Sequence, residues 1–249
     1  MANVTSNDGA VINYQAVGSG PALVLVDGAL AHSRFRRSPP PPAALAHYTL
    51  VTYDRRGRGD SGDAAAYDPE REVDDVAALV ERLGAPVALY GFSSGAALAL
   101  RAAARLREQV SQLVLHDAPY GGSDEAARRE FLGYAEQMKQ LISEQRRSDA
   151  LSLFLSDMLA PDALAALKTE PDWPVMERVA HTLVYDNAIL GDGAVPVALA
   201  QQVTAATWVL DSEQGPPFVK DAADALAAVI PRARRKTVQG AVPLAALLR

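Results

Sequence analysis

The sequence predicts one α/β domain in which helices cover both faces of a mostly parallel sheet. Apolar runs of strand type alternate with amphipathic helical segments along the first half of the chain, and the same rhythm resumes near the C-terminus. The length of 249 residues suits one large domain that buries most of its apolar surface. We therefore expect the functional residues at the carboxyl ends of the strands.

The chain begins with a predicted β-hairpin. Residues 4–6 and 11–17 are strand-like, and the Asn-Asp-Gly sequence at 7–9 supplies the turn between them. Residues 22–26 are continuously apolar, which is typical of a strand that is buried on both faces. This strand ends at Asp27-Gly28, where we expect a turn at the sheet edge.

The next elements continue the alternation. Residues 39–42 are prolines, which predict a stiff extended segment leading into a short helix over 43–47. A strand is predicted over 48–53, and the loop 54–62 that follows reads DRRGRGDSG. Apolar residues between 69 and 83 recur at helical spacing on one face, so we expect a helix there.

The most informative segment is Gly91-Phe92-Ser93-Ser94-Gly95. It follows an apolar strand over 86–90 and precedes an alanine-rich helix that begins at Ala96. This is the pattern of a nucleophile elbow, in which two glycines permit a strained turn that lifts the serine oxygen above the sheet edge. A further strand, over 110–115, follows that helix.

Residues 120–206 interrupt the strand pattern. They read as consecutive helices punctuated by prolines, and strand character returns over 207–211. We expect these residues to form a helical cap inserted over the site, and residues 1–119 with 207–249 to form the core. A helix over 218–230, a strand over 233–238 and a short helix over 243–248 complete the core.

Composition excludes several classes of function. The net charge of −6 argues against nucleic acid or an anionic membrane as the main partner. The absence of cysteine excludes thiolate chemistry, and neither a leader nor a run of about 18 apolar residues is found, so we expect a cytoplasmic protein. The sequence has no dinucleotide glycine fingerprint and no cluster of metal ligands, and therefore implies no cofactor and no metal.

Three motifs in order give the chain a resemblance to the α/β-hydrolase family that extends over nearly its whole length. Asp27-Gly28 stands in the place of the family's His-Gly oxyanion turn, residues 54–61 are similar to its D-x-R-G-x-G-x-S loop, and the elbow follows. The chain looks closest to small bacterial esterase-like members. The resemblance implies that Ser93 is the nucleophile and that the N–H groups of Ala29 and Ser94 bind the oxyanion. It also implies a triad acid, for which Asp211 and Asp117 are the candidates; a cap of a helix or loop is the alternative role of either residue.

The family's histidine normally follows the last strand, but residues 238–243 carry no ionisable group. The four histidines are elsewhere, at positions 32, 47, 116 and 181. A serine without a base in hydrogen-bond reach is a poor nucleophile at neutral pH. Of the four, His32 is best placed to face the pocket, because it lies in the loop just after the oxyanion turn; a solvent-exposed loop histidine is the alternative.

The expected partner is a small, apolar molecule that carries a carbonyl, and a homodimer is possible. Five aromatic residues are candidates for the walls of its pocket, although aromatic residues of this kind more often serve simple core packing. They are Phe35, Phe92, Tyr120, Trp173 and Tyr185.

Three hypotheses of different classes follow. The first is an enzyme that uses the oxyanion donors for cyclisation, isomerisation or elimination without an acyl-enzyme. The second is an esterase or lactonase whose base has moved, with His32 as the candidate. The third is a catalytically silent ligand-binding relative. We favour the first, because the elbow and oxyanion turn are kept while the histidine segment is erased.

Overall fold

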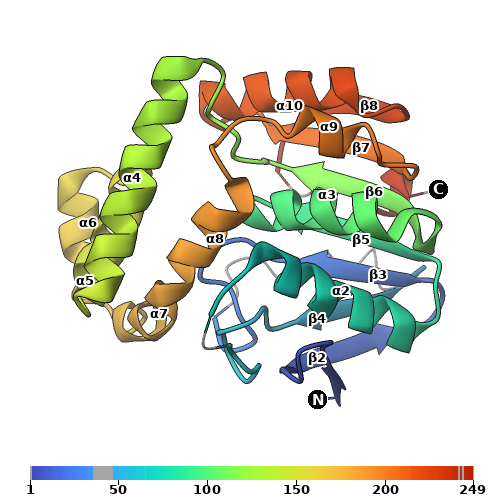
Figure 1. The fold of residues 1–249 in the computed structure, drawn as a ribbon, viewed down its shortest axis with the longest axis horizontal. Helices are drawn as coiled ribbons and strands as arrows, with labels where there is room; N and C mark the ends of the chain where they lie inside the picture. The colour runs from blue at the N-terminus through green and yellow to red at the C-terminus, as the bar shows by residue number, and fades with distance from the viewer. Residues whose placement is uncertain (1, 36–46, 65, 241, 243, 249) are drawn as a thin grey trace.

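The sheet of this computed structural model has eight strands in the order β1-β2-β4-β3-β5-β6-β7-β8 (Figure 1). The structure describes residues 2–35, 47–64, 66–240, 242 and 244–248. The prolines 39–42 and the predicted helix over 43–47, except for its last residue His47, therefore lie outside the described residues. The strands are β1 (Ala2–Thr5), β2 (Val11–Gly18), β3 (Ala22–Val26), β4 (Thr49–Tyr53), β5 (Val87–Phe92), β6 (Val110–His116), β7 (Ala206–Ser212) and β8 (Ala233–Val238).

The pairing confirms a mostly parallel sheet. β1 pairs antiparallel with β2, and β2 pairs antiparallel with β4, whereas the pairs from β4 through β3, β5, β6 and β7 to β8 are parallel. The predicted hairpin joins β1 to β2, and Gly9 in its turn has φ of +88°, which glycine adopts without strain. The parallel strands end at one edge, and this edge carries the elbow.

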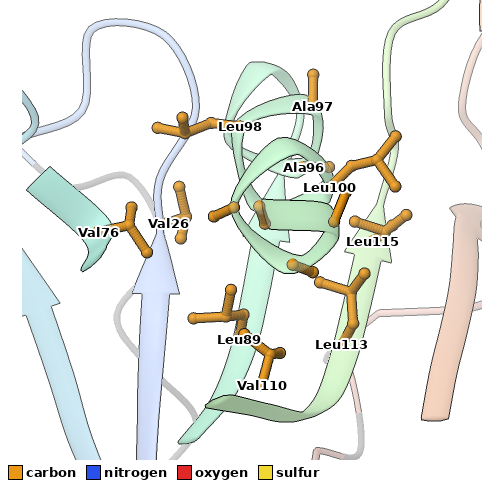
Figure 2. Close-up of a cluster of buried hydrophobic side chains, with 14 of the residues drawn as sticks. Val26, Val76, Leu89, Ala96, Ala97, Leu98, Leu100, Val110, Leu113 and Leu115 are labelled. Carbon is orange, nitrogen blue, oxygen red and sulfur yellow. The ribbon is translucent and has the colours of Figure 1, made fainter. Parts of the chain in front are cut away.

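Helices α2 (Pro69–Leu83), α3 (Ser94–Leu106) and α10 (Pro217–Val229) pack against one face of the sheet. Helix α2 has the bounds that the apolar spacing predicts. Asp68 caps its first turn by accepting a hydrogen bond from the N–H of Glu70, and Gly84 ends it. Figure 2 shows α3 seated among apolar side chains that include Val26 from β3 and Leu113 from β6. The elbow thus rests on the buried apolar core.

The other face of the sheet is covered, within the described residues, by the end of the chain. Val242 and the helix α11 (Leu244–Leu247) pack on an apolar cluster that includes Leu23 of β3 and Val114 of β6. The predicted strand over 233–238 and the short terminal helix are therefore both present.

Six α-helices lie between β6 and β7, in the interval where the sequence predicts an insertion. The bundle α4 to α7 stands to one side of the sheet, and α8 runs back from it toward α3 (Figure 1). The helices are α4 (Glu125–Ser143), α5 (Arg147–Ser156), α6 (Pro161–Leu167), α7 (Trp173–Val179), α8 (Leu183–Leu190) and α9 (Val197–Ala200). Their apolar cluster includes Leu30, which comes from the turn after β3. This segment therefore packs directly on the turn that leads to the site.

Candidate active site

Ser93 occupies a strained turn between β5 and α3. Its φ of 55° and ψ of −129° lie where residues other than glycine are rare. A Cβ on Gly91 would collide with the carbonyl oxygen of Gly95, and a Cβ on Gly95 would collide with that of Val26. Only glycine fits at these two positions, which explains the G-x-S-x-G spacing and leaves the Ser93 side chain above the strand ends.

The turn after β3 passes directly beside Ser93. A Cβ on Gly28 would lie 3.0 Å from Ser93 Cβ and 3.5 Å from Ser93 Oγ, so the backbone approaches as closely as a glycine allows. In the described part of the chain, neither the N–H of Ala29 nor that of Ser94 donates a hydrogen bond. Both groups are therefore available to a developing negative charge next to Ser93.

A buried ion cluster lies behind this turn. Arg55 and Arg58, from the loop after β4, contact the carboxylates of Glu72 on α2 and Asp186 on α8. All four side chains are at most 6% exposed. The Asp186 carboxylate also accepts a hydrogen bond from Ser94 Oγ at 2.7 Å. Sequence reasoning missed these roles, because the partners are far apart in the chain.

The two candidate acids have different surroundings. Asp211 is fully buried, accepts a hydrogen bond from Thr237 Oγ1 at 2.9 Å and is paired with Arg235. Both partners are residues of β8, so the carboxylate of Asp211 is bound by that strand. Asp117 follows β6 with φ of 50° and accepts hydrogen bonds from the N–H and the hydroxyl of Ser212. The structure thus places Asp117 at the strand edge near the elbow, and Asp211 among the structural contacts of β8.

His116, at the end of β6, belongs to a chain of hydrogen bonds. Its Nδ1 lies 2.7 Å from Tyr90 Oη, and its Nε2 lies 3.1 Å from Ser212 Oγ and 3.5 Å from the Asp117 carboxylate. Because the Ser212 hydroxyl donates to Asp117, His116 Nε2 must donate to Ser212 and Nδ1 must accept from Tyr90. Its carbonyl oxygen accepts from the N–H of Ser93 at 2.9 Å. Both ring nitrogens of His116 are therefore engaged.

His32 follows the oxyanion turn and is 4% exposed. Its Nδ1 accepts a hydrogen bond from the N–H of Arg34 at 3.3 Å, and its buried Nε2 has no partner among the described residues. Burial lowers the pKa of His32, and although Asp54 acts in the opposite direction, Arg58 adds to the lowering. His32 is therefore neutral at pH 7.

Neither of the two remaining histidines contacts the elbow in the part of the chain that the structure describes. His181 precedes α8, and its Nε2 is 3.4 Å from Asp63. His47 is exposed. Among the described residues, none accepts a hydrogen bond from Ser93 Oγ.

The five aromatic candidates are spread over several environments. Phe92 is 43% exposed beside Ser93, which is unusual for so large an apolar side chain, and Phe35 packs at the edge of the helical cluster of α4 to α7. Tyr120 lies in the main core, and Trp173 is buried within the helical cluster. Tyr185 stacks on Tyr67 with ring centroids 3.9 Å apart. Of the five, Phe92 lies within the elbow itself, and Phe35 is the nearest in the chain to the oxyanion turn.

Within the ranges that the structure describes, no group of three or more His, Asp or Glu side chains could hold a metal ion. Over those same ranges, every helix is too short or too polar to cross a membrane.

A mostly parallel eight-stranded sheet that carries a serine elbow opposite free backbone N–H groups defines the α/β-hydrolase class of proteins. Residues 23–242 match the model of the alpha/beta hydrolase family, and the chain belongs to that family.

Similarity to known proteins supports this assignment. An alpha/beta hydrolase from Sphaerobacter thermophilus has a similar structure, with a TM-score of 0.82 and 35% identity over 97% of this chain and 94% of the other. The uncharacterized hydrolase YraK of Bacillus subtilis is 33% identical over 58% of this chain; the chain thus matches about half, 54%, of that curated relative's length. Esterase RhEst1 from Rhodococcus shares the fold, with a TM-score of 0.67 and 22% identity over 98% of this chain and 92% of the other.

Proposed function

We propose that this protein is a carboxylic-ester hydrolase, an esterase or lactonase, in which Ser93 is the nucleophile. The observation that carries the proposal is the position of Ser93, on a strained elbow within van der Waals distance of a turn whose next N–H group, that of Ala29, is free. The membership of the chain in the hydrolase family supports this reading. It replaces the non-hydrolytic reaction that the sequence favours, because the similar proteins are hydrolases and an esterase.

The reaction has two steps. Ser93 Oγ attacks the carbonyl carbon of the ester, its proton passes to a base, and the N–H groups of Ala29 and Ser94 stabilise the negative oxygen of the tetrahedral intermediate. The C–O bond to the leaving alkoxide breaks, and the alkoxide takes the proton from the base. Water then attacks the acyl-enzyme, and the same groups assist the release of the carboxylic acid.

His32 is the base that we assign to this reaction. It is neutral at pH 7, and its Nε2 is bound to no described residue. While Nδ1 accepts from the N–H of Arg34, the ring proton resides on Nε2. This hydrogen bond must open, so that Nδ1 carries the proton and Nε2 accepts the proton of Ser93. We expect substrate binding to accompany that change.

A second candidate function is a non-hydrolytic reaction on a carbonyl compound, such as cyclisation, isomerisation or elimination. One observation favours it: no described side chain accepts a hydrogen bond from Ser93 Oγ. Two N–H donors and a confined substrate are sufficient for such a reaction, because the donors polarise the carbonyl. In this case Ser93 is not a nucleophile, and an alanine at its position leaves the activity largely intact.

The test combines turnover of p-nitrophenyl esters and a lactone with intact-mass detection of a fluorophosphonate adduct. It uses the wild type, Ser93→Ala and His32→Gln, with His181→Gln as the control because His181 contacts Asp63 and not the elbow. We expect a single adduct that is lost in Ser93→Ala, and turnover reduced by about 10³-fold or more in Ser93→Ala and by about 10²-fold or more in His32→Gln.

The outcomes separate the two candidates. No adduct and no ester turnover in the wild type would exclude the hydrolase and leave the non-hydrolytic reaction. An adduct with full turnover in His32→Gln would keep Ser93 as the nucleophile and remove His32 as its base.

A further inference from the structure

We propose that Asp186, on helix α8, is a positioning residue that holds both N–H donors of the oxyanion hole in place. The contribution of Asp186 to catalysis rests on the proposed function, whereas its structural effect on the two N–H donors does not. One carboxylate reaches the elbow through Ser94 and reaches the turn after β3 through Arg58.

The contact with the elbow is direct. Ser94 Oγ donates a hydrogen bond to Asp186 Oδ1 at 2.7 Å, and Ser94 is the first residue of α3. The same residue supplies one of the free N–H groups beside Ser93. A side chain that is fixed at its hydroxyl restricts the backbone to which it is attached, so this bond orients the N–H of Ser94.

The contact with the oxyanion turn passes through Arg58. Its Nη2 lies 2.8 Å from both carboxylate oxygens of Asp186, and its Nη1 donates to the carbonyl oxygen of Gly28 at 2.7 Å. The peptide bond between Gly28 and Ala29 is planar and its C=O and N–H groups point in opposite directions. Because Arg58 fixes the C=O, it directs the N–H of Ala29 to the opposite side of the turn, away from the ion cluster.

Arg55 completes the support. Its Nη1 donates to Asp186 Oδ1 at 2.8 Å and to the carbonyl oxygen of Asp27 at 3.2 Å, while its Nε and Nη2 form a bidentate pair with Glu72 at 2.8 and 2.9 Å. Two arginines thus face two carboxylates, and the cluster is neutral. Loss of the charge on Asp186 would leave one buried positive charge without compensation.

Asp186 carries its negative charge at neutral pH. Burial acts to raise the pKa of Asp186, but Arg58 and Arg55 outweigh it and hold the pKa below the ordinary value of 3.8. The Asp186 carboxylate therefore accepts charge-assisted hydrogen bonds at neutral pH, and it does so in a buried site.

The decisive comparison is between Asp186→Asn and Asp75→Asn. Asp75 is a matched control, because it is also buried and also paired with an arginine of the same loop, Arg56, with Nη2 to Oδ1 of 2.7 Å and Nε to Oδ2 of 3.0 Å. None of its hydrogen bonds reaches Gly28 or Ser94. Both variants lose one buried carboxylate charge, but only Asp186→Asn loosens the two donors.

Two measurements are made on each full-length variant. The first is amide hydrogen exchange of the segments 27–31 and 93–96 by mass spectrometry, which needs no activity. The second is kcat and KM for a p-nitrophenyl ester. For Asp186→Asn we expect exchange in segment 93–96, where the N–H groups of Ser93 and Ala96 are hydrogen-bonded, to become at least about 10-fold faster. We expect kcat to fall by about 10- to 100-fold with KM within about threefold, since loss of one donor costs about 10²- to 10³-fold.

Unchanged exchange in segment 93–96 of Asp186→Asn, or an equal change in Asp75→Asn, would overturn the inference. Absence of ester turnover in the wild type would defeat the proposed function alone, because the exchange data still decide the positioning role. Should Asp186→Asn fail to fold, Arg58→Lys is measured in the same way. It keeps the positive charge but cannot reach Gly28 and both carboxylate oxygens at once, so we expect the same faster exchange, and unchanged exchange would again overturn the inference.

Discussion

Asp117 accepts two hydrogen bonds from Ser212, one from the backbone N–H at 2.7 Å and one from the hydroxyl at 2.6 Å. This pair joins the carboxyl ends of β6 and β7 beneath the elbow. It also ends a chain of donors that begins at Tyr90 Oη and passes through His116. A carboxylate is an acceptor only, so all hydrogen bonds of the chain point toward Asp117.

Replacement of Ser212 by alanine is expected to destabilise the fold by about 1 to 3 kcal/mol. The variant leaves the buried Nε2–H of His116 without its acceptor and removes one hydrogen bond to Asp117. Urea unfolding measures the effect. Ser111→Ala is the control, since that hydroxyl donates one bond to the carbonyl of Val87 at the opposite end of β6; an equal loss in both variants would contradict the prediction.

The buried position of His116 makes stability dependent on pH. Burial lowers the pKa of His116 below 6.5, although Asp117 and Asp211 act in the opposite direction. Below pH 6.5 the unfolded chain binds a proton that the folded chain does not, so the free energy of unfolding decreases as the pH falls from 6.5 toward the folded pKa. One such group changes it by at most about 1.4 kcal/mol per pH unit.

We therefore expect His116→Gln to lose less stability than the wild type between pH 7.5 and pH 5, as measured by urea unfolding at both values. The control is His47→Gln, because His47 is exposed. An identical pH dependence in the wild type and in His116→Gln would show that His116 does not contribute.

Asp211→Asn is expected to lower stability without abolishing ester turnover. Its carboxylate is bound by Thr237 and paired with Arg235, so the change weakens a buried ion pair of β7 and β8, at a cost of about 3 kcal/mol or more. Thermal unfolding and kcat of the folded variant provide the measurement. A normal melting temperature with lost turnover would instead assign the triad acid to Asp211.

Gly95→Ala is expected to prevent the elbow from forming. The new Cβ would collide with the carbonyl oxygen of Val26 and lie 2.5 Å from that of Asp27, and both are backbone atoms that cannot move alone. We expect a loss of about 3 kcal/mol or more, or no folded protein. Gly133→Ala is the control, because nothing lies within 4 Å of its Cβ on α4; it should gain about 0.5 to 1 kcal/mol.

Sequence patterns predicted those elements whose structure depends on residues close together in the chain. The apolar spacing predicted both ends of α2, and the two glycines around Ser93 predicted the elbow, because each depends on neighbours in the chain. The parallel order of the core strands followed from their alternation with helices.

The support of the site could not be predicted in the same way. Arg58 and Asp186 are 128 positions apart, and each alone resembles an ordinary surface charge of a loop or helix. The pair becomes visible only when α8 is packed on the core. Ser212 was passed over for a similar reason, since a serine at the end of a strand gives no sign of the carboxylate that faces it from β6.

The stack of Tyr67 on Tyr185 has a consequence for the way in which molecules enter the site. Together with the Asp186 cluster, it secures two successive residues of α8 to the core. A lid that opened by swinging α8 would have to break both attachments and expose buried charge. We therefore expect α8 to stay in place during turnover, so that substrates enter the site without a movement of this helix.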